Sequence, residues 1–427
     1  MRPKPKGAST PALVAWAFYD WANSSYAAVI QTFIFAAYFT RSVASNEVIG
    51  SSQWGMTVSF AGLFVALTGP ILGALADAGG NRKKWLAILT AFCVLSTASL
   101  WWVLPTPSSV PLALTLVILS TVTTEFCYIF YNAMLPDLVP SSHIGRWSGW
   151  GWSLGYVGGM LSLLVALWLV TSDHLAWIPL DHSSAAHIRA TFVLCALWYF
   201  VFSLPLFLFT PETRERHRSA KRVIRQGLKQ LWETFTHIRK YSYMVRFLIA
   251  RLFYIDGLTT LFAYGGVYAA GVFGLSAHEV IVFGITLNVF AGIGSAIGAF
   301  VDDFFGSRNT ILASLIGLTS FSIAILLVKE ERLFWIFGVC IGLFVGPVQA
   351  SSRSLMARLA PEHMRTEMFG FFAFSGKATA FVGPAFVAWV TYLTQSQRLG
   401  MSTIVLFFLF GGALLSTLPS EKKLLRN

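Results

Sequence analysis

Charge is scarce in this chain of 427 residues. Asp, Glu, Lys and Arg together make up 12% of it, whereas a soluble domain carries about 25%. Apolar residues make up 56%. A soluble protein of this length, with domains of about 150 residues each, would need polar faces on its helices. Because this chain lacks the charge to form them, its apolar residues indicate contact with lipid.

Residue types that carry catalytic or redox chemistry are also few. The four cysteines, Cys93, Cys127, Cys195 and Cys340, share no short spacing, so we expect neither a disulfide nor a metal site. None of the eight histidines lies deep in an apolar stretch, and the nucleotide-binding pattern Gly-x-x-x-x-Gly-Lys-Ser/Thr is absent. We therefore expect no cofactor and no catalytic residue, which argues against a membrane enzyme and excludes an ATP-driven pump.

Long apolar blocks separated by short polar stretches dominate the sequence. Their lengths fit twelve membrane-spanning helices, and they do not alternate in period two as the strands of a barrel would. The blocks cover residues 13–40, 53–77, 84–104, 111–136, 146–171, 189–209, 244–272, 278–300, 308–328, 333–357, 367–392 and 400–418. The first block has no small-residue cleavage site, so we expect it to remain as a helix. The predicted fold is an all-α integral membrane protein.

The basic residues are distributed unevenly over the two sides of this arrangement. Most of the 31 Lys and Arg residues fall in loops on the side that carries both chain ends. The opposite side holds Arg41, Arg189, Lys329, Arg332 and Arg398. The positive-inside rule then places both termini in the cytoplasm. The net charge of +12 is spread over several loops and two tails, so we expect no nucleic-acid partner.

The longest loop, residues 211–243, separates a first set of six helices (1–210) from a second set (244–427). Apolar residues recur in this loop at helical spacing, at Ile224, Leu228, Leu231, Phe235 and Ile238. Basic residues occupy the other face, at Lys221, Arg222, Arg225, Lys229 and Lys240. This pattern predicts an amphipathic helix on the inner leaflet. A linker helix held by anionic lipid is favoured over a docking site for a partner.

The two halves share a loop motif, found in residues 73–84 and 298–308. Three pairs of residues align: Asp77 with Asp303, Gly80 with Gly306, and Arg82 with Arg308. The glycines permit a tight reversal, and the charged residues offer an ion pair that forms or breaks as the halves move. Asp77, Arg82, Asp303 and Arg308 are therefore gating candidates. The alternative is a plain helix turn with a solvated basic face.

A second pair of loops also matches between the halves. Residues 138–140 followed by Gly149 correspond to residues 359–361 followed by Gly370. Both loops precede helices rich in small residues, which allow close helix packing in lipid. Since packing alone explains these glycines, we assign them no role in solute binding.

These repeated motifs resemble the signature of the major facilitator superfamily. More specifically, residues 18–26, 131–137, 149–159, 251–257, 349–358 and 374–377 resemble the vacuolar amino-acid effluxer-like (autophagy-related effluxer) family. The resemblance implies two pseudo-symmetric six-helix bundles around a central cavity, which move a solute by alternating access. The short outer loops are similar to those of bacterial-type members, which implies an inner (plasma) membrane. Residues 155–159 lack the proline of the antiporter element, so antiport is not supported.

Five ionisable residues lie within the apolar blocks: Asp20, Glu125, Arg251, Asp256 and Lys377. Each costs about 2.5–3.5 kcal/mol to insert and therefore calls for a reason. A carboxylate in an apolar cavity is suited to carry a proton, so Glu125, Asp256 and Asp20 are the candidates for proton coupling. An ion pair between Asp256 and Lys377 without a role in transport is the alternative. Arg251 and Asp256 are spaced poorly for pairing with each other.

Acidic, basic and amide groups together suit a small polar or zwitterionic solute, such as an amino acid. The candidates for binding it are Asn23, Asn132, Asp256, Gln349 and Lys377. Arg353 is placed with the cytoplasmic loops. We expect a monomeric secondary transporter whose partners are a small solute, a proton and membrane lipid. The alternative is a sensor or scaffold that kept the fold and lost transport.

Overall fold

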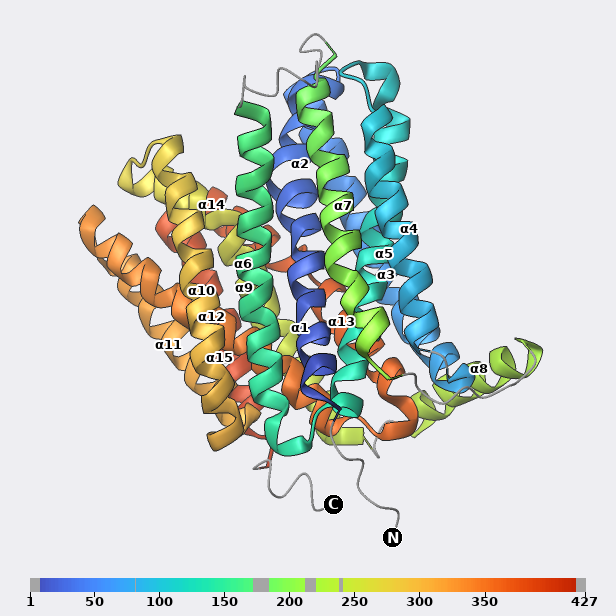
Figure 1. Cartoon of the computed structure of the whole chain (residues 1–427). Helices are drawn as coiled ribbons and strands as arrows, with labels where there is room; N and C mark the ends of the chain where they lie inside the picture. The colour runs from blue at the N-terminus through green and yellow to red at the C-terminus, as the bar shows by residue number, and fades with distance from the viewer. Residues whose placement is uncertain (1–7, 81, 172–183, 212–219, 238–240, 420–427) are drawn as a thin grey trace.

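A computed structural model shows a bundle of long helices, and no strand occurs in the part of the chain that it describes (Figure 1). The structure describes residues 8–80, 82–171, 184–211, 220–237 and 241–419. Within these ranges, 11 helices are long and apolar enough to cross a membrane. The prediction of an all-α membrane protein is confirmed.

The helices follow the predicted apolar blocks closely. In the first half they are α1 (Thr10–Ser25), α2 (Ile34–Tyr38), α3 (Glu47–Gly79), α4 (Arg82–Ser99), α5 (Val110–Leu138), α6 (Ile144–Thr171) and α7 (Ala186–Phe209). Helix α8 (Ala220–Thr236) lies in the predicted linker. In the second half they are α9 (Ser242–Phe273), α10 (Ala277–Phe305), α11 (Ser307–Leu327), α12 (Glu331–Leu359), α13 (Arg365–Lys377), α14 (Val382–Thr394) and α15 (Gln397–Ser416).

The first crossing is a continuous but uneven helix. Two π-helical segments, Tyr26–Phe33 and Phe39–Val43, follow α1 and α2. They divide the crossing into pieces that are each shorter than a membrane span. This segment occupies the block expected to cross at residues 13–40, and it is not among the 11 helices that are long and apolar enough to span.

The helix ends at the repeated loop motif use glycine in the same way in both halves. Helix α3 ends at Gly80 with φ 78°, and α10 ends at Gly306 with φ 86°. A side chain at either position would strain the backbone, since L-residues rarely adopt positive φ. The glycines of the repeat therefore allow the sharp reversals into α4 and α11.

The eleventh crossing departs from prediction. A single helix was expected over residues 367–392, but α13 ends at Lys377 and α14 begins at Val382. Pro384 has no N–H, so it cannot donate to the carbonyl of Ala380 as a helical residue would. The backbone between the helices forms tighter bonds instead, including Val382 N–H to the Thr379 carbonyl at 2.7 Å.

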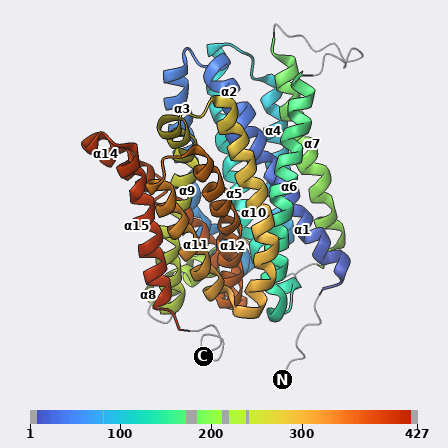
Figure 2. The same ribbon diagram turned by 90° about the vertical axis from the view of Figure 1, so that its left-hand side faces the viewer.

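The two halves lie side by side (Figures 1 and 2), and Figure 1 shows α8 extending sideways from one end of the bundle. Near that end, α3 packs on α13, and α6 packs on α10. A Cβ added to Gly73 would lie 2.4 Å from the Thr366 carbonyl oxygen, and one on Gly149 would lie 2.5 Å from Ala299 Cβ. Glycine is therefore required where the halves meet. The division at 210 and 244 stays a prediction.

One face of the linker helix α8 packs on α3, and the other face is exposed. A Cβ on Gly227 would lie 2.9 Å from the Leu75 side chain, so α8 packs directly on α3. Ile224, Leu228 and Trp232 remain exposed at four-residue spacing. This exposed apolar stripe is compatible with the predicted contact to lipid. Ile238 and Lys240 lie outside the described residues.

The orientation can be tested with the two ends of helix α5. Ser108 and Ser142 are exposed and flank α5 at opposite ends. In a cysteine-free background, an impermeant thiol reagent applied to intact cells should label Ser108→Cys and spare Ser142→Cys, because the basic loops favour the cytoplasm. Permeabilised cells, in which both should react, provide the control. Labelling of Ser142→Cys alone would reverse the topology.

Candidate functional site

A cavity of about 560 Å³ lies between the two halves. The first half lines it from the first crossing, α5 and α6, and the second half lines it from α9 and α10. The lining extends from Asp20 in α1 to Phe33 and, across the cavity, to Val280 in the first turn of α10. It therefore opens away from α8, toward the side predicted to be external.

The base of this cavity is an ion pair between the halves. The Arg353 guanidinium of α12 donates from Nη1 to Asp20 Oδ2 in α1 at 2.8 Å. Both side chains are almost fully buried, with relative exposures of 2% and 7%. Arg353 also donates to the Ser148 hydroxyl at 2.9 Å and to the Ser148 carbonyl at 2.6 Å. One guanidinium thus holds α12 to two helices of the other half.

Aromatic rings surround the same guanidinium. Its Cζ lies 5.1 Å from the ring centroid of Trp16, 5.6 Å from that of Tyr131 and 5.7 Å from that of Trp152. Such rings attract a desolvated cation. The placement of Arg353 with the cytoplasmic loops is therefore wrong. Arg353 precedes the end of α12 by six residues, or about 9 Å along the helix, and sequence reasoning underestimated this depth.

The predicted solute-binding amides lie around this cavity in different ways. Asn23 accepts a hydrogen bond from the Tyr128 hydroxyl at 2.8 Å, and Gln349 donates to the Tyr156 hydroxyl at 3.2 Å. Both tyrosines line the cavity. Asn132 accepts a bond from Arg353 at 3.3 Å and is buried with it. The amides therefore mainly form hydrogen bonds with the side chains that face the cavity.

Two further predicted residues, Glu125 and Lys377, form a second ion pair between the halves. Lys377 Nζ in α13 lies 2.7 Å from Glu125 Oε1 in α5. The pair is less buried than the Asp20 pair, with exposures of 37% and 15%. Lys377 thus pairs with Glu125, and the alternative ion pair with Asp256 does not form. Neither residue lines the cavity as the structure outlines it.

Arg251 and Asp256 do not pair with each other either. The Arg251 guanidinium donates to the Phe372 carbonyl at 2.6 Å and to the Ser375 hydroxyl at 2.7 Å. Asp256 is fully buried, away from the cavity lining. The predicted spacing argument against an Arg251–Asp256 pair agrees with this arrangement.

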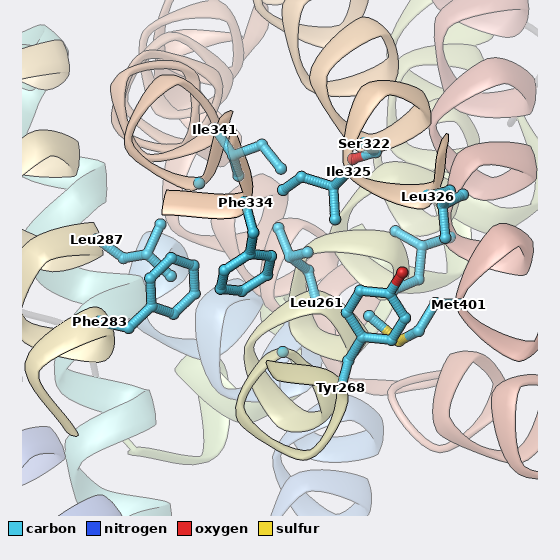
Figure 3. A pocket seen from close by; sticks show the side chains of 13 residues that line it. Leu261, Tyr268, Phe283, Leu287, Ser322, Ile325, Leu326, Phe334, Ile341 and Met401 are labelled. Carbon is cyan, nitrogen blue, oxygen red and sulfur yellow. The ribbon is translucent and has the colours of Figure 1, made fainter. Parts of the chain in front are cut away.

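A small apolar recess of about 50 Å³ adjoins the cavity within the second half (Figure 3). It shares Leu261, Gly265, Phe283 and Leu287 with the cavity wall. Phe334, Ile341 and Met401 are among the side chains that close its far side, so the recess extends the cavity with an apolar surface.

The gating candidate Asp77 bridges the halves at the end near α8. Its carboxylate accepts a bond from Arg82 at 2.8 Å within the first half. It also accepts bonds from the Thr366 hydroxyl at 2.7 Å and the Glu367 N–H at 2.9 Å in the first turn of α13. A carboxylate is favoured there by the free N–H groups and the helix dipole. Asp137 extends the network by pairing with Arg82 at 2.5 Å and with Arg365.

Asp303 forms the equivalent contact in the second half. It accepts a bond from the Gly145 N–H at 2.9 Å, in the first turn of α6. Its nearer cation partner, however, is Arg358, at 3.2 Å, which also pairs with Asp302 at 2.7 Å, and Arg146 of α6 pairs with Asp303 at 3.6 Å. The predicted ion pair between Asp303 and Arg308 is therefore absent.

Arg308 instead donates to the Ser416 carbonyl at 2.7 Å, at the end of α15. The second copy of the motif thus keeps the carboxylate and takes its cation from the end of α12. Sequence reasoning missed Asp137 and Arg358 as members of the two networks. Their signal was available, because the second matching pair of loops aligns Asp137 with Arg358.

Glu367 ties the linker helix to the same network. It is fully buried and accepts bonds from Gln230 and Thr234 of α8, both at 2.6 Å. Its backbone N–H is the group that binds Asp77. The linker helix is therefore bonded to the crossing that closes this end of the protein.

Sequence comparison identifies the family. The family described as "Vacuole effluxer Atg22 like" matches residues 41–426. The chain belongs to this family. It is 28% identical to the "Uncharacterized MFS-type transporter YxiO" of Bacillus subtilis (strain 168), over 95% of this chain and 94% of that one. It is 24% identical to Autophagy-related protein 22 of Kluyveromyces lactis, over 61% of this chain and 55% of that one.

Solved structures show the same fold. The major facilitator superfamily transporter FucP, solved in an outward conformation, matches with a TM-score of 0.75 and 14% identity, over 96% of this chain and 98% of FucP. The proton:xylose symporter XylE matches with a TM-score of 0.72 and 14% identity, over 96% and 95%. The chain is thus a multi-pass membrane protein with the major facilitator fold of two pseudo-symmetric six-helix bundles.

The role of the Asp77 network can be measured as a distance change. Asp77→Asn removes charge-assisted hydrogen bonds worth about 1.5–3 kcal/mol each, so the end near α8 should open more often, by about tenfold or more. Spin labels at the exposed positions Ser142 and His363 report the separation of the halves there. Asp77→Asn should shift this distance distribution to longer values.

Glu47→Gln is the matched control, because its ion pair with Arg41 is exposed and lies at the opposite end. It should leave the Ser142–His363 distances unchanged. An unchanged distribution in folded Asp77→Asn would show that the network has no part in gating.

Proposed function

We propose that this family member is a secondary transporter that moves a small polar or zwitterionic solute by alternating access. The carrying observation is the cavity that is open at one end and closed at its base by Asp20 and Arg353. The pair joins the two halves, so it must separate when the cavity opens to the other side. Among the described residues, no group of three or more His, Cys, Asp or Glu side chains is placed to hold a metal ion.

The polar groups of the cavity support a solute with both charges. Asp20 presents a carboxylate, Tyr128 and Tyr156 present hydroxyls, and Asn288 presents an amide. Arg353 lies directly behind Asp20 and is the nearest cation to the cavity base. An amino group of the solute that binds Asp20, and a carboxylate of the solute that binds Arg353, would each compete with the ion pair. Solute binding would therefore favour separation of Asp20 from Arg353. Asn23, Asn132 and Gln349 would keep the neighbouring groups in place.

Proton coupling is proposed at the two inter-bundle pairs, Asp20–Arg353 and Glu125–Lys377. A proton on either carboxylate removes the ion pair that joins the halves, so protonation would favour their separation. Asp256, the third candidate for proton coupling, forms no such pair, and neither of its carboxylate oxygens has a hydrogen-bond partner among the described residues. Both termini and the linker are proposed to be cytoplasmic, in a bacterial-type inner membrane.

The cavity can be tested by filling it. A Cβ on Gly265 would have no neighbour within 4 Å, so Gly265→Leu is tolerated by the packing but occupies the cavity and the mouth of its recess. Overpacking a bound solute costs about 1–3 kcal/mol, so affinity should fall about ten- to hundredfold. The readout is thermal stabilisation of the purified protein across a panel of amino acids, followed by uptake of the stabilising solute into proteoliposomes.

Gly55→Leu is the control, since Gly55 also has open space but lies outside the cavity lining. It should retain both stabilisation and uptake. Equal activity of the two leucine variants would mean that the solute does not bind in this cavity.

Proton coupling can be separated from solute binding with Glu125→Gln. The amide cannot be protonated in the same way, so accumulation driven by a proton gradient should be lost. Exchange of labelled solute at equal concentrations should persist, because it needs the cavity and the movement of the halves but no net proton transfer. Glu47→Gln again serves as the control. Normal accumulation in Glu125→Gln would remove Glu125 from the coupling mechanism.

A further inference from the structure

The carboxylate of Asp256 is buried without compensation. Its relative exposure is 0%, and neither oxygen has a hydrogen-bond partner among the described residues. Two basic side chains of the same crossings are engaged elsewhere: Lys377 binds Glu125, and Arg251 binds the Phe372 carbonyl. A buried ionised carboxylate without a cation or donor is strongly disfavoured, so Asp256 must take up either a proton or a metal cation.

Next to Asp256, the eleventh crossing has lost its helical hydrogen bonds. The Ala380 N–H bonds to the Lys377 carbonyl at 3.4 Å, and the Val382 N–H bonds to the Thr379 carbonyl. The carbonyls of Gly376 and Ala378 thereby lose the donors they would have in an α-helix. The carbonyl of Ala380 loses its donor because residue 384 is proline. Three oxygen atoms are thus released at one helix break.

Packing places this break against Asp256. A Cβ on Gly383 would lie 3.0 Å from the Asp256 carbonyl oxygen and 2.0 Å from Thr260 Oγ1. The first turn of α14 therefore rests on the turn of α9 that carries Asp256. The Thr379 side chain, one turn earlier, lies beside the Asp256 carboxylate, and its buried hydroxyl has no partner within hydrogen-bond geometry in the described structure.

We propose that Asp256, the Thr379 hydroxyl and the three released carbonyls (residues 376, 378 and 380) form a binding site for a small monovalent cation, Na⁺. Oxygen ligands at a broken membrane helix suit a hard cation. One carboxylate balances one positive charge, so Na⁺ leaves the site neutral. A proton would satisfy the carboxylate alone and leave the hydroxyl and carbonyls without a ligand.

This inference rests on the proposed transport function only in making Na⁺ a coupling ion, because binding of Na⁺ requires no solute. The ion would join α9 to both segments of the eleventh crossing. Binding or release of the ion would therefore change how α13, the first segment of this crossing, is held against Asp77 at the closed end of the protein. This contact gives a structural route from the ion to the gate.

The test is the melting temperature of the purified protein, without solute, as NaCl replaces KCl or N-methylglucamine chloride at constant ionic strength and pH. A ligand that binds only the folded state stabilises it as RT ln(1 + [L]/Kd), so melting should rise and saturate with Na⁺. Asp256→Asn should lose this rise. Thr379→Val keeps the shape but removes the hydroxyl, so its apparent Kd for Na⁺ should increase about tenfold, or about 1.4 kcal/mol.

Thr97→Val is the matched control, since Thr97 is also a buried threonine but lies in α4 of the other half. It should respond to Na⁺ like the unaltered protein. A full Na⁺ response in Asp256→Asn would overturn the proposal, as would a protein whose melting depends on pH but not on Na⁺, which would assign Asp256 to a proton. If Asp256→Asn does not fold, an unchanged Na⁺ affinity in Thr379→Val overturns the proposal.

The Na⁺ titration tests the ion site separately from the proposed transport function. Na⁺ binding without any stabilising solute would support the ion site and leave transport to be settled by the cavity variants. Solute binding without a Na⁺ response would support transport and reject the ion site.

Discussion

The guanidinium of Arg353 is the contact on which the closed base of the cavity depends. It binds Asp20 of α1 and Ser148 of α6 while its own helix, α12, belongs to the opposite half. While the base is closed, Arg353 is almost fully buried and its charge is satisfied by these partners alone, so separation of the halves must replace them with water or solute. Closure of the cavity and satisfaction of a buried charge are therefore the same event.

Close backbone packing makes that contact possible. A Cβ on Gly151 would lie 2.6 Å from Asp20 Oδ2 and 2.9 Å from Arg353 Nη2, so only glycine leaves room for the ion pair. Further toward α8, the glycines at Gly73 and Gly149 bring the halves into backbone contact. At this end, the glycines set how closely the two halves approach, and the ion pairs determine which side chains meet across the contact.

The Asp77 and Asp303 networks have similar geometry but take their cations from different positions. Asp77 and Asp303 each accept an N–H from the first turn of a helix in the other half. Arg82 pairs with the first, whereas Arg358 and Arg146, from two other helices, pair with the second. Glu367 bonds the linker helix α8 to the Asp77 network only. The repeat therefore preserved the helix-dipole contact while the cation moved to a different position.

Much of the architecture could be predicted from the sequence, because a lipid environment imposes simple rules. A run of apolar residues must form a helix to satisfy its backbone, so the blocks gave the crossings closely. The eleventh crossing failed this rule, because a hydropathy pattern does not show that the 378–381 backbone leaves the helix. The residues that belong to the candidate site were largely visible as charges and amides in apolar surroundings.

The partners of those residues were not visible. Lys377 was expected near Asp256 and instead binds Glu125, and Arg353 was placed outside the membrane and instead closes the cavity. A single sequence gives the depth of a charge only to within a few residues, and it gives neither the face of the helix nor the neighbouring helix. By itself, the sequence determined that the chain crosses the membrane as two related sets of helices carrying buried charges. Only the tertiary structure decided which charges meet, because pairing depends on how helices distant in sequence rotate and pack against one another.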